Sequence, residues 1–185
     1  WREYLHTELN DLFPDQPLTR QHLFLEDISR RIPGLQIKKL DPVIARLRHR
    51  KKPEEVAYIR ESLGIIDDAL HSVMKKLKPG LMEYQIEAEI VYHYLNNGCN
   101  RLGYEAIVAG GENAAILHYV TNHAQLNDGD LLLIDTGGEY GMYSGDITRT
   151  YPVNGKFSPR QRQCYQAVLD VNQAFIKALK PGDSW

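Results

Sequence analysis

Two aspartates stand where an apolar segment meets a glycine-rich turn. In "LLLIDTGGEYGMYSGDITRTYP", which runs from Leu131 to Pro152, Asp135 follows three leucines and an isoleucine, and Asp146 comes 146 − 135 = 11 residues later. A carboxylate buried among apolar side chains is costly unless it is paired with a cation or binds a metal. Asp135 therefore either marks the end of a strand or helps to hold an ion.

The spacing favours a pair of antiparallel strands. Asp130 to Asp135 and Tyr143 to Pro152 can pair around Gly137, Gly138 and Gly141, since glycine accepts the backbone angles of tight connections. A turn centred near Tyr140 and Gly141 puts Asp135 directly opposite Asp146, with their β-carbons about 5 Å apart. Two such carboxylates repel each other, and a divalent cation such as magnesium, calcium or manganese removes that conflict. Two aspartates are too few for a complete site, so further ligands must come from elsewhere.

Two other interpretations remain open at this point. Aspartate is common at turns because its side chain bonds the local backbone, so Asp135 and Asp146 can be ordinary turn residues. The stretch "LLLIDTGG" also has the apolar run and Asp-Thr-Gly of aspartic proteases, in which two aspartates share a proton. That fold is all-β, and the long helices expected in this chain argue against it.

The composition is that of an ordinary globular protein. The 185 residues carry a net charge of −2, with 43% hydrophobic and 25% charged residues. Neither a membrane-spanning run nor the apolar core of a signal peptide is present, so we expect a cytoplasmic protein without a membrane partner.

Cys99 and Cys164 lack close-spaced partners, which argues against a zinc knuckle or a disulfide framework. The basic stretch from Asp41 to Lys52 resembles a nucleic-acid patch, but its apolar positions and the balanced charge favour a solvated helix.

Hydrophobic periodicity gives the expected elements. Apolar residues at three- and four-residue steps follow Pro53, and Pro79-Gly80 ends that helix. Lys180-Pro181-Gly182 repeats Lys78-Pro79-Gly80 at an offset of 180 − 78 = 102, which indicates an internal repeat whose second unit has only begun. The expected helices are 41–52, 53–78, 83–97 and 159–179, and the expected strands are 106–109, 115–119, 130–135 and 147–153.

A longer stretch resembles a known family. The residues "LLLIDTGGEYGMYSGDITRTYPVNGKFSPRQ", with "NAAILHYVTNHAQLNDGD" upstream, look like bacterial-type aminopeptidase P, the Xaa-Pro aminopeptidases of the pita-bread metallopeptidase fold. The resemblance extends from about Asp41 to the end of the chain. It implies an α+β fold that is the first half of a pita-bread domain. Residues 1–40 would be the tail of an N-terminal domain, 41–52 a connecting helix, and 53–185 the truncated catalytic domain.

The resemblance also implies roles for three residues. Asp135 resembles the ligand of a single metal ion, and Asp146 resembles the ligand that bridges two ions, which are typically manganese in this family. His118 matches a histidine that binds substrate and stabilises the reacting peptide. The remaining ligands of the family, one His and two Glu, have no match in this chain, so we expect the chain alone to be inactive.

The implied activity is metal-assisted hydrolysis that releases the first residue from peptides with Pro in second position. Prolidase, which cleaves Xaa-Pro dipeptides, is the closest alternative, and Gly145 before Asp146 fits aminopeptidase P better. Methionine aminopeptidase fits the stretch from Pro152 to Phe157 poorly. A non-catalytic pita-bread binding protein is a further alternative, against which the two retained aspartates count. The expected partners are a peptide substrate and, in a homo-oligomer, further copies of the chain. The exposed half-core would make the chain alone unstable or associated with another chain.

Overall fold

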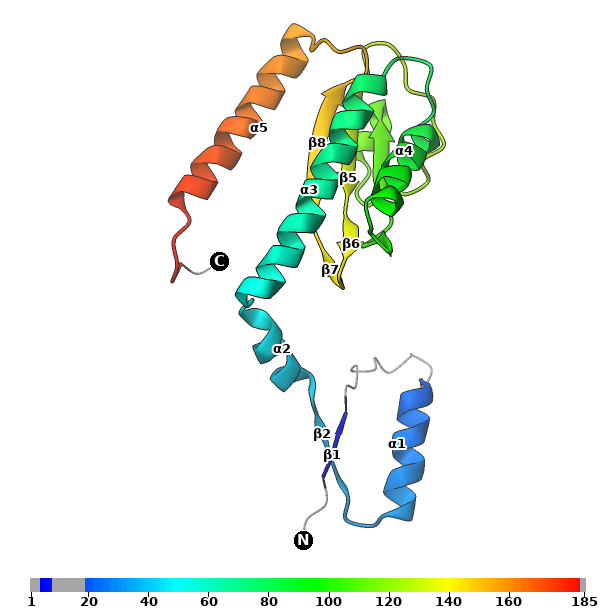
Figure 1. Cartoon of the computed structure of the whole chain (residues 1–185), viewed down its shortest axis with the longest axis vertical. Coiled ribbons are helices and arrows are strands. Elements are labelled where there is room, and N and C mark those ends of the chain that lie inside the picture. The colour runs from blue at the N-terminus through cyan, green and yellow to red at the C-terminus, as the bar shows by residue number, and fades with distance from the viewer. Residues whose placement is uncertain (1–3, 8–18, 184–185) are drawn as a thin grey trace. The chain divides into compact units, whose positions relative to one another are not determined.

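The computed structural model describes the backbone of residues 4–7 and the whole of residues 19–183 (Figure 1). The chain divides into two compact units, Trp1–Pro53 and Glu54–Trp185. No helix in the described ranges is long and apolar enough to span a membrane.

The first unit is small. Strand β1 (Tyr4–Thr7) pairs in parallel with β2 (Gln36–Lys39), and helix α1 (Arg20–Arg31) lies between them in the sequence. Thr19 caps α1, because its side chain accepts a hydrogen bond from the backbone N–H of His22. Helix α2 (Asp41–His49) follows β2. The helix expected at 41–52 is therefore present, and α1 was not predicted.

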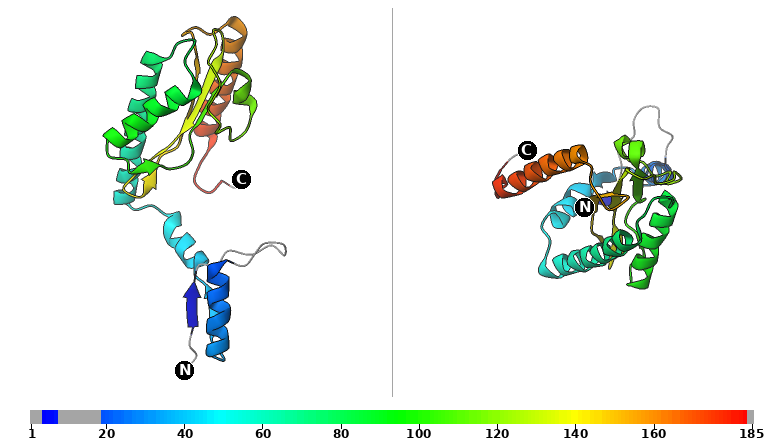
Figure 2. Two further views of the ribbon diagram at one scale, coloured as in Figure 1. Left: turned by 90° about the vertical axis from the view of Figure 1, so that its right-hand side faces the viewer. Right: turned by 90° about the horizontal axis from the view of Figure 1, so that it is seen from above.

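The second unit is built from two helices packed on a three-stranded antiparallel sheet. Helices α3 (Pro53–Lys76) and α4 (Glu83–Asn96) cover one face of the sheet, whose strand order is β4–β5–β8 (Figures 1 and 2). The strands are β4 (Ile107–Gly110), β5 (Leu131–Thr136) and β8 (Ile147–Pro152). Their buried residues form one core, which includes Ile66 and Val73 of α3, Ile90 and Tyr94 of α4, and Leu132 and Ile134 of β5.

A second, smaller sheet has the order β3–β6–β7, formed by Arg101–Leu102, Gly138–Tyr140 and Tyr143–Ser144. Helix α5 (Pro159–Ala178) follows β8, begins with a Ser158 cap that bonds Gln161, and has no buried residue. In Figure 2, α5 lies on the other side of the sheet from α3 and α4.

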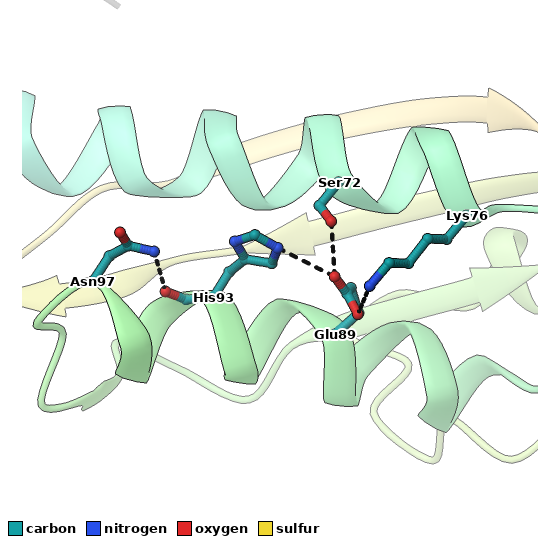
Figure 3. Close-up of polar contacts among 5 residues, drawn as sticks. All are labelled: Ser72, Lys76, Glu89, His93 and Asn97. Atoms are coloured by element: carbon teal, nitrogen blue, oxygen red, sulfur yellow. Dashed lines mark hydrogen bonds and ion pairs between the residues drawn. The ribbon is translucent and has the colours of Figure 1, made fainter.

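Polar contacts also join α3 to α4. Glu89 of α4 accepts hydrogen bonds from Ser72 Oγ and Lys76 Nζ of α3, each at 2.7 Å, and lies 3.1 Å from His93 Nε2 (Figure 3). The Lys76 hydrogen bond is the largest cause that lowers the pKa of Glu89 below its ordinary value. These polar contacts hold the two helices together at the edge of their apolar interface.

Two expectations about strands are wrong. The segment 115–119 is not a strand, because the 3-10 helix η1 (Gly111–Ala115) occupies its start and His118 has a left-handed backbone, with φ of 54°. Asp135 does not lie opposite Asp146, since its partner across the ladder is Thr148.

The tight turn explains the shifted register. Tyr140 pairs with Tyr143, so the two central turn residues are Gly141 and Met142, one position later than expected. Both have positive φ, 57° and 69°, as a type I′ hairpin turn requires. A left-handed methionine gives no signal in the sequence, so the turn centre was misplaced by one residue and the pairing by two.

Candidate metal centre

The strand that carries Asp135 alternates between two environments. Leu132, Ile134 and Thr136 are buried toward the helices, whereas Leu131, Leu133 and Asp135 are only partly buried. The side chains of a strand point alternately to its two faces, so Asp135 lies on the face away from the α3–α4 core. The charge at the end of the apolar strand is therefore half-buried rather than embedded in the core.

Asp146 is held by its neighbour in the chain. Gly145 is buried against α3, and its backbone N–H donates to Ser62 Oγ at 2.7 Å, while the same hydroxyl donates to the Gly138 carbonyl oxygen at 2.7 Å. A Cβ on Gly145 would lie 2.7 Å from Ile66 Cδ1 and 3.0 Å from Ser62 Oγ, so a larger residue would have to displace these side chains. Ser62 thereby fixes the backbone on both sides of the hairpin, and Asp146 projects from it as an exposed side chain.

A tyrosine joins the two aspartates. The Tyr104 hydroxyl donates to Asp135 Oδ1 at 2.6 Å and lies 2.9 Å from Asp146 Oδ1. The two carboxylate oxygens therefore lie no more than 2.6 + 2.9 = 5.5 Å apart. Burial, followed by the hydrogen bonds to the two carboxylates, raises the pKa of Tyr104, so the hydroxyl stays protonated. The two aspartates therefore lie close together, as expected. They do not lie directly opposite each other across the strand ladder, so that part of the prediction was wrong.

The donor set fits a divalent metal in part. The ion pairs found among residues 19–183 involve neither aspartate, so both carboxylates keep oxygens that can bind a cation. Oxygen ligands of this type suit magnesium or manganese. Within the same range, however, no group of three or more His, Cys, Asp or Glu side chains comes together. The residues present thus supply two ligands and leave the others to be provided from elsewhere.

His118 lies apart from this pair in its contacts. It is exposed, sits on the segment after η1, and makes no hydrogen bond with any described residue. Its neighbour Tyr119 is anchored, since its hydroxyl donates to Glu83 Oε2 at 2.8 Å. The structure therefore brings Asp135 and Asp146 together and joins His118 to neither by a direct contact.

Tyr104 was missed by the sequence analysis. It follows Gly103 in "RLGYEA", a stretch with no periodicity, and lies 31 residues before Asp135. Its place depends on glycines: a Cβ on Gly137 would collide with the Gly145 carbonyl oxygen and lie 2.7 Å from Tyr104 Cε1. Gly137, expected as part of the turn, instead leaves space for the Tyr104 ring, and Gly138 leaves space for Cys99 Sγ and the Tyr94 ring.

Comparisons with known proteins identify the family of this chain. The family model of Metallopeptidase family M24 matches residues 57–185. The chain is 44% identical over 143 residues to Xaa-Pro aminopeptidase of Escherichia coli, and 46% identical over 144 residues to that of Haemophilus influenzae. These matches cover 77% of this chain in both cases, and 32% and 33% of the relatives. The chain thus spans about a third of the length of the curated relatives it matches.

Solved structures give the same result. Aminopeptidase PepP of Pseudomonas aeruginosa matches with a TM-score of 0.87 and 35% identity, covering 99% of this chain and 42% of that one. A variant of Escherichia coli aminopeptidase P in complex with substrate matches with a TM-score of 0.85 and 34% identity, covering 97% and 42%.

The α+β expectation and the resemblance to part of the aminopeptidase P pita-bread domain are thereby confirmed. With its two aspartates converging on one tyrosine and with these matches, the chain belongs to metallopeptidase family M24 and is a homologue of Xaa-Pro aminopeptidases.

Proposed function

We propose that this chain is the first half of the catalytic domain of a manganese-dependent Xaa-Pro aminopeptidase, preceded by the tail of an N-terminal domain at 1–40 and a connecting helix at 41–52. The single observation that carries the proposal is the convergence of Asp135 and Asp146 on the Tyr104 hydroxyl. Identity of 44% to the Escherichia coli enzyme supports the substrate class, a peptide with Pro in second position. A cytoplasmic location is part of the same proposal.

In this proposal each named residue has a distinct task. Asp135 would hold one ion and Asp146 would contact both, as the family resemblance implies. The chemistry that divalent ions would supply at this site is a water of lowered pKa and polarisation of the scissile carbonyl group. Tyr104 keeps the two carboxylates within reach of one another through its donated hydrogen bond, and His118 binds the substrate from its exposed segment. One His and two Glu from outside this chain complete the ligand set.

The proposal also predicts what the isolated chain does. Two carboxylates hold a divalent ion weakly, and the described ranges offer no third side chain of the right type beside them. We therefore expect the 185-residue chain alone to release no amino acid from Xaa-Pro peptides.

The test is peptide hydrolysis by the full-length protein that carries this chain. With manganese present, it should release the first residue from a tripeptide Xaa-Pro-Xaa, and Asp146→Asn should abolish that release. Cleavage of Xaa-Pro dipeptides alone would assign prolidase activity instead. Absence of hydrolysis of both would favour a non-catalytic pita-bread protein and overturn the proposal.

A further inference from the structure

Glu83, the first residue of α4, has a fully buried carboxylate with 0% relative exposure. Its Oε1 accepts from the Gly110 backbone N–H at 2.8 Å and from Asn113 Nδ2 at 3.0 Å. Its Oε2 accepts from the Tyr119 hydroxyl and the Ala124 backbone N–H, both at 2.8 Å. Four donors therefore surround one side chain.

No cation balances this charge, since none of the ion pairs found among residues 19–183 involves Glu83. A buried carboxylate without a cation is stable only when hydrogen bonds replace its lost hydration, and its position in the first turn of α4 adds the favourable helix dipole. The cost of burial is thus offset by contacts that all come from one segment, 110–124. Removing one of these donors would leave part of the buried carboxylate without a hydrogen bond, which would destabilise the folded chain.

The four donors are spread along that segment. Gly110 and Ala124 are its two ends, and Asn113 and Tyr119 lie between them. Asn113 Nδ2 also donates a hydrogen bond to the Tyr119 hydroxyl at 3.0 Å, so the two side chains hold each other in place. The backbone of Glu83 adds a fifth contact, because its N–H donates to the Ala124 carbonyl oxygen at 2.9 Å.

His118 lies next to one of these anchored residues in the chain. It directly precedes Tyr119, has the unfavourable left-handed φ of 54°, and has no hydrogen bond of its own to any described residue. A left-handed backbone angle is uncommon in a non-glycine residue, and it is favoured where the surrounding structure holds the chain in place. The anchored Tyr119 is the nearest fixed point in the chain.

We propose that Glu83 is a positioning residue for His118: its buried carboxylate holds the segment 110–124 in the conformation that presents the histidine to substrate. The inference rests on the proposed function for the role of His118, but the restraint on the segment does not. The two parts can therefore be tested separately.

The informative substitution is Glu83→Gln, which keeps the shape of the side chain. Whichever way the amide is oriented, its NH2 group faces a backbone N–H donor, that of Gly110 at one position or of Ala124 at the other. Glu89→Gln is the matched control, because Glu89 lies on the same helix and its partners are Ser72, Lys76 and His93, all outside the segment. Should Glu83→Gln fail to fold, Tyr119→Phe removes only one donor, with Tyr92→Phe on the exposed surface of α4 as its control.

Hydrogen exchange followed by mass spectrometry of the full-length protein tests the restraint. Glu83→Gln, or Tyr119→Phe, should speed amide exchange at least 10-fold in peptides from 110–124 and leave α3 unchanged, and Glu89→Gln should not alter that segment. Unchanged exchange in the segment, or a uniform increase over the whole protein, would overturn the inference whether or not the protein cleaves peptides.

A double-mutant cycle, measured by cleavage of Xaa-Pro peptides, tests whether Glu83 acts through His118. Glu83→Gln alone should lower kcat/KM about 10- to 100-fold, as a misplaced binding group does. In a His118→Ala background the same substitution should change kcat/KM less than about threefold, because the group it positions is already absent. Losses that simply multiply would mean that Glu83 acts by a route independent of His118, and would overturn the proposal.

Discussion

Ser62 connects helix α3 to both sides of the hairpin that carries the aspartates, and replacing it by alanine should destabilise the second unit strongly. The substitution removes one hydroxyl but leaves two buried backbone groups without that partner, the Gly138 carbonyl and the Gly145 N–H. An unsatisfied buried group costs about 1–3 kcal/mol, so the two together give about 2–6 kcal/mol. The lower part of this range applies, because a buried carbonyl without a partner is better tolerated than a buried N–H without one. We therefore expect a loss of about 2–4 kcal/mol in the free energy of unfolding.

Ser72→Ala is the matched control, since Ser72 lies on the same helix. Its hydroxyl donates to Glu89, which keeps its contacts with Lys76 and His93. That substitution should cost less than about 1 kcal/mol. Urea unfolding followed by far-ultraviolet circular dichroism measures both free energies. A difference between the two variants below about 0.5 kcal/mol would refute the reasoning that Ser62 satisfies two buried groups.

Three further outcomes are expected. Tyr104→Phe removes the donor shared by the two aspartates and should weaken manganese binding by the full-length protein about 10- to 100-fold in calorimetric titration, and an unchanged affinity would contradict the positioning role. Met142→Gly should raise the free energy of unfolding by up to about 1 kcal/mol in urea titration, because glycine accepts the φ of 69° without strain, and destabilisation would contradict the turn assignment. Because the pKa of Glu89 is lowered in the folded chain, its contribution to stability is present above the ordinary value of 4.5 and is lost as pH falls through the lowered value. Glu89→Gln should therefore reduce the melting temperature at neutral pH and have little effect in strong acid, whereas an equal effect at both would contradict the contact with Lys76.

Elements with strong local signals could be predicted from the sequence. The helix beginning at Pro53 and ending before Pro79-Gly80 was expected because its apolar residues repeat at helical spacing, and it is α3. The strand leading to Asp135 was also expected, and it is β5. In both cases the deciding information, periodicity or punctuation by Pro and Gly, lies within the segment itself.

The rest depended on contacts between distant residues. The apolar stretch around Ile116 and Leu117 suggested a strand, but nothing in the described ranges pairs with it, and Tyr119 is instead drawn to Glu83 on α4. Tyr104 reaches the aspartates across 31 and 42 residues of sequence, and no pattern within "RLGYEA" indicates this. The prediction that Asp135 and Asp146 lie directly opposite each other was wrong for a more local reason. Met142 in the turn has a left-handed backbone, which the sequence does not indicate.

The most direct test of the central claim is the metal content of the full-length protein after equilibration with manganese and removal of free ions. The resemblance assigns one ion to Asp135 and a bridging position between two ions to Asp146. Elemental analysis should therefore find two ions per chain in the wild type, about one in Asp135→Asn and essentially none in Asp146→Asn. Retention of both ions by Asp146→Asn would contradict the account, since the hairpin would then not contribute the bridging ligand.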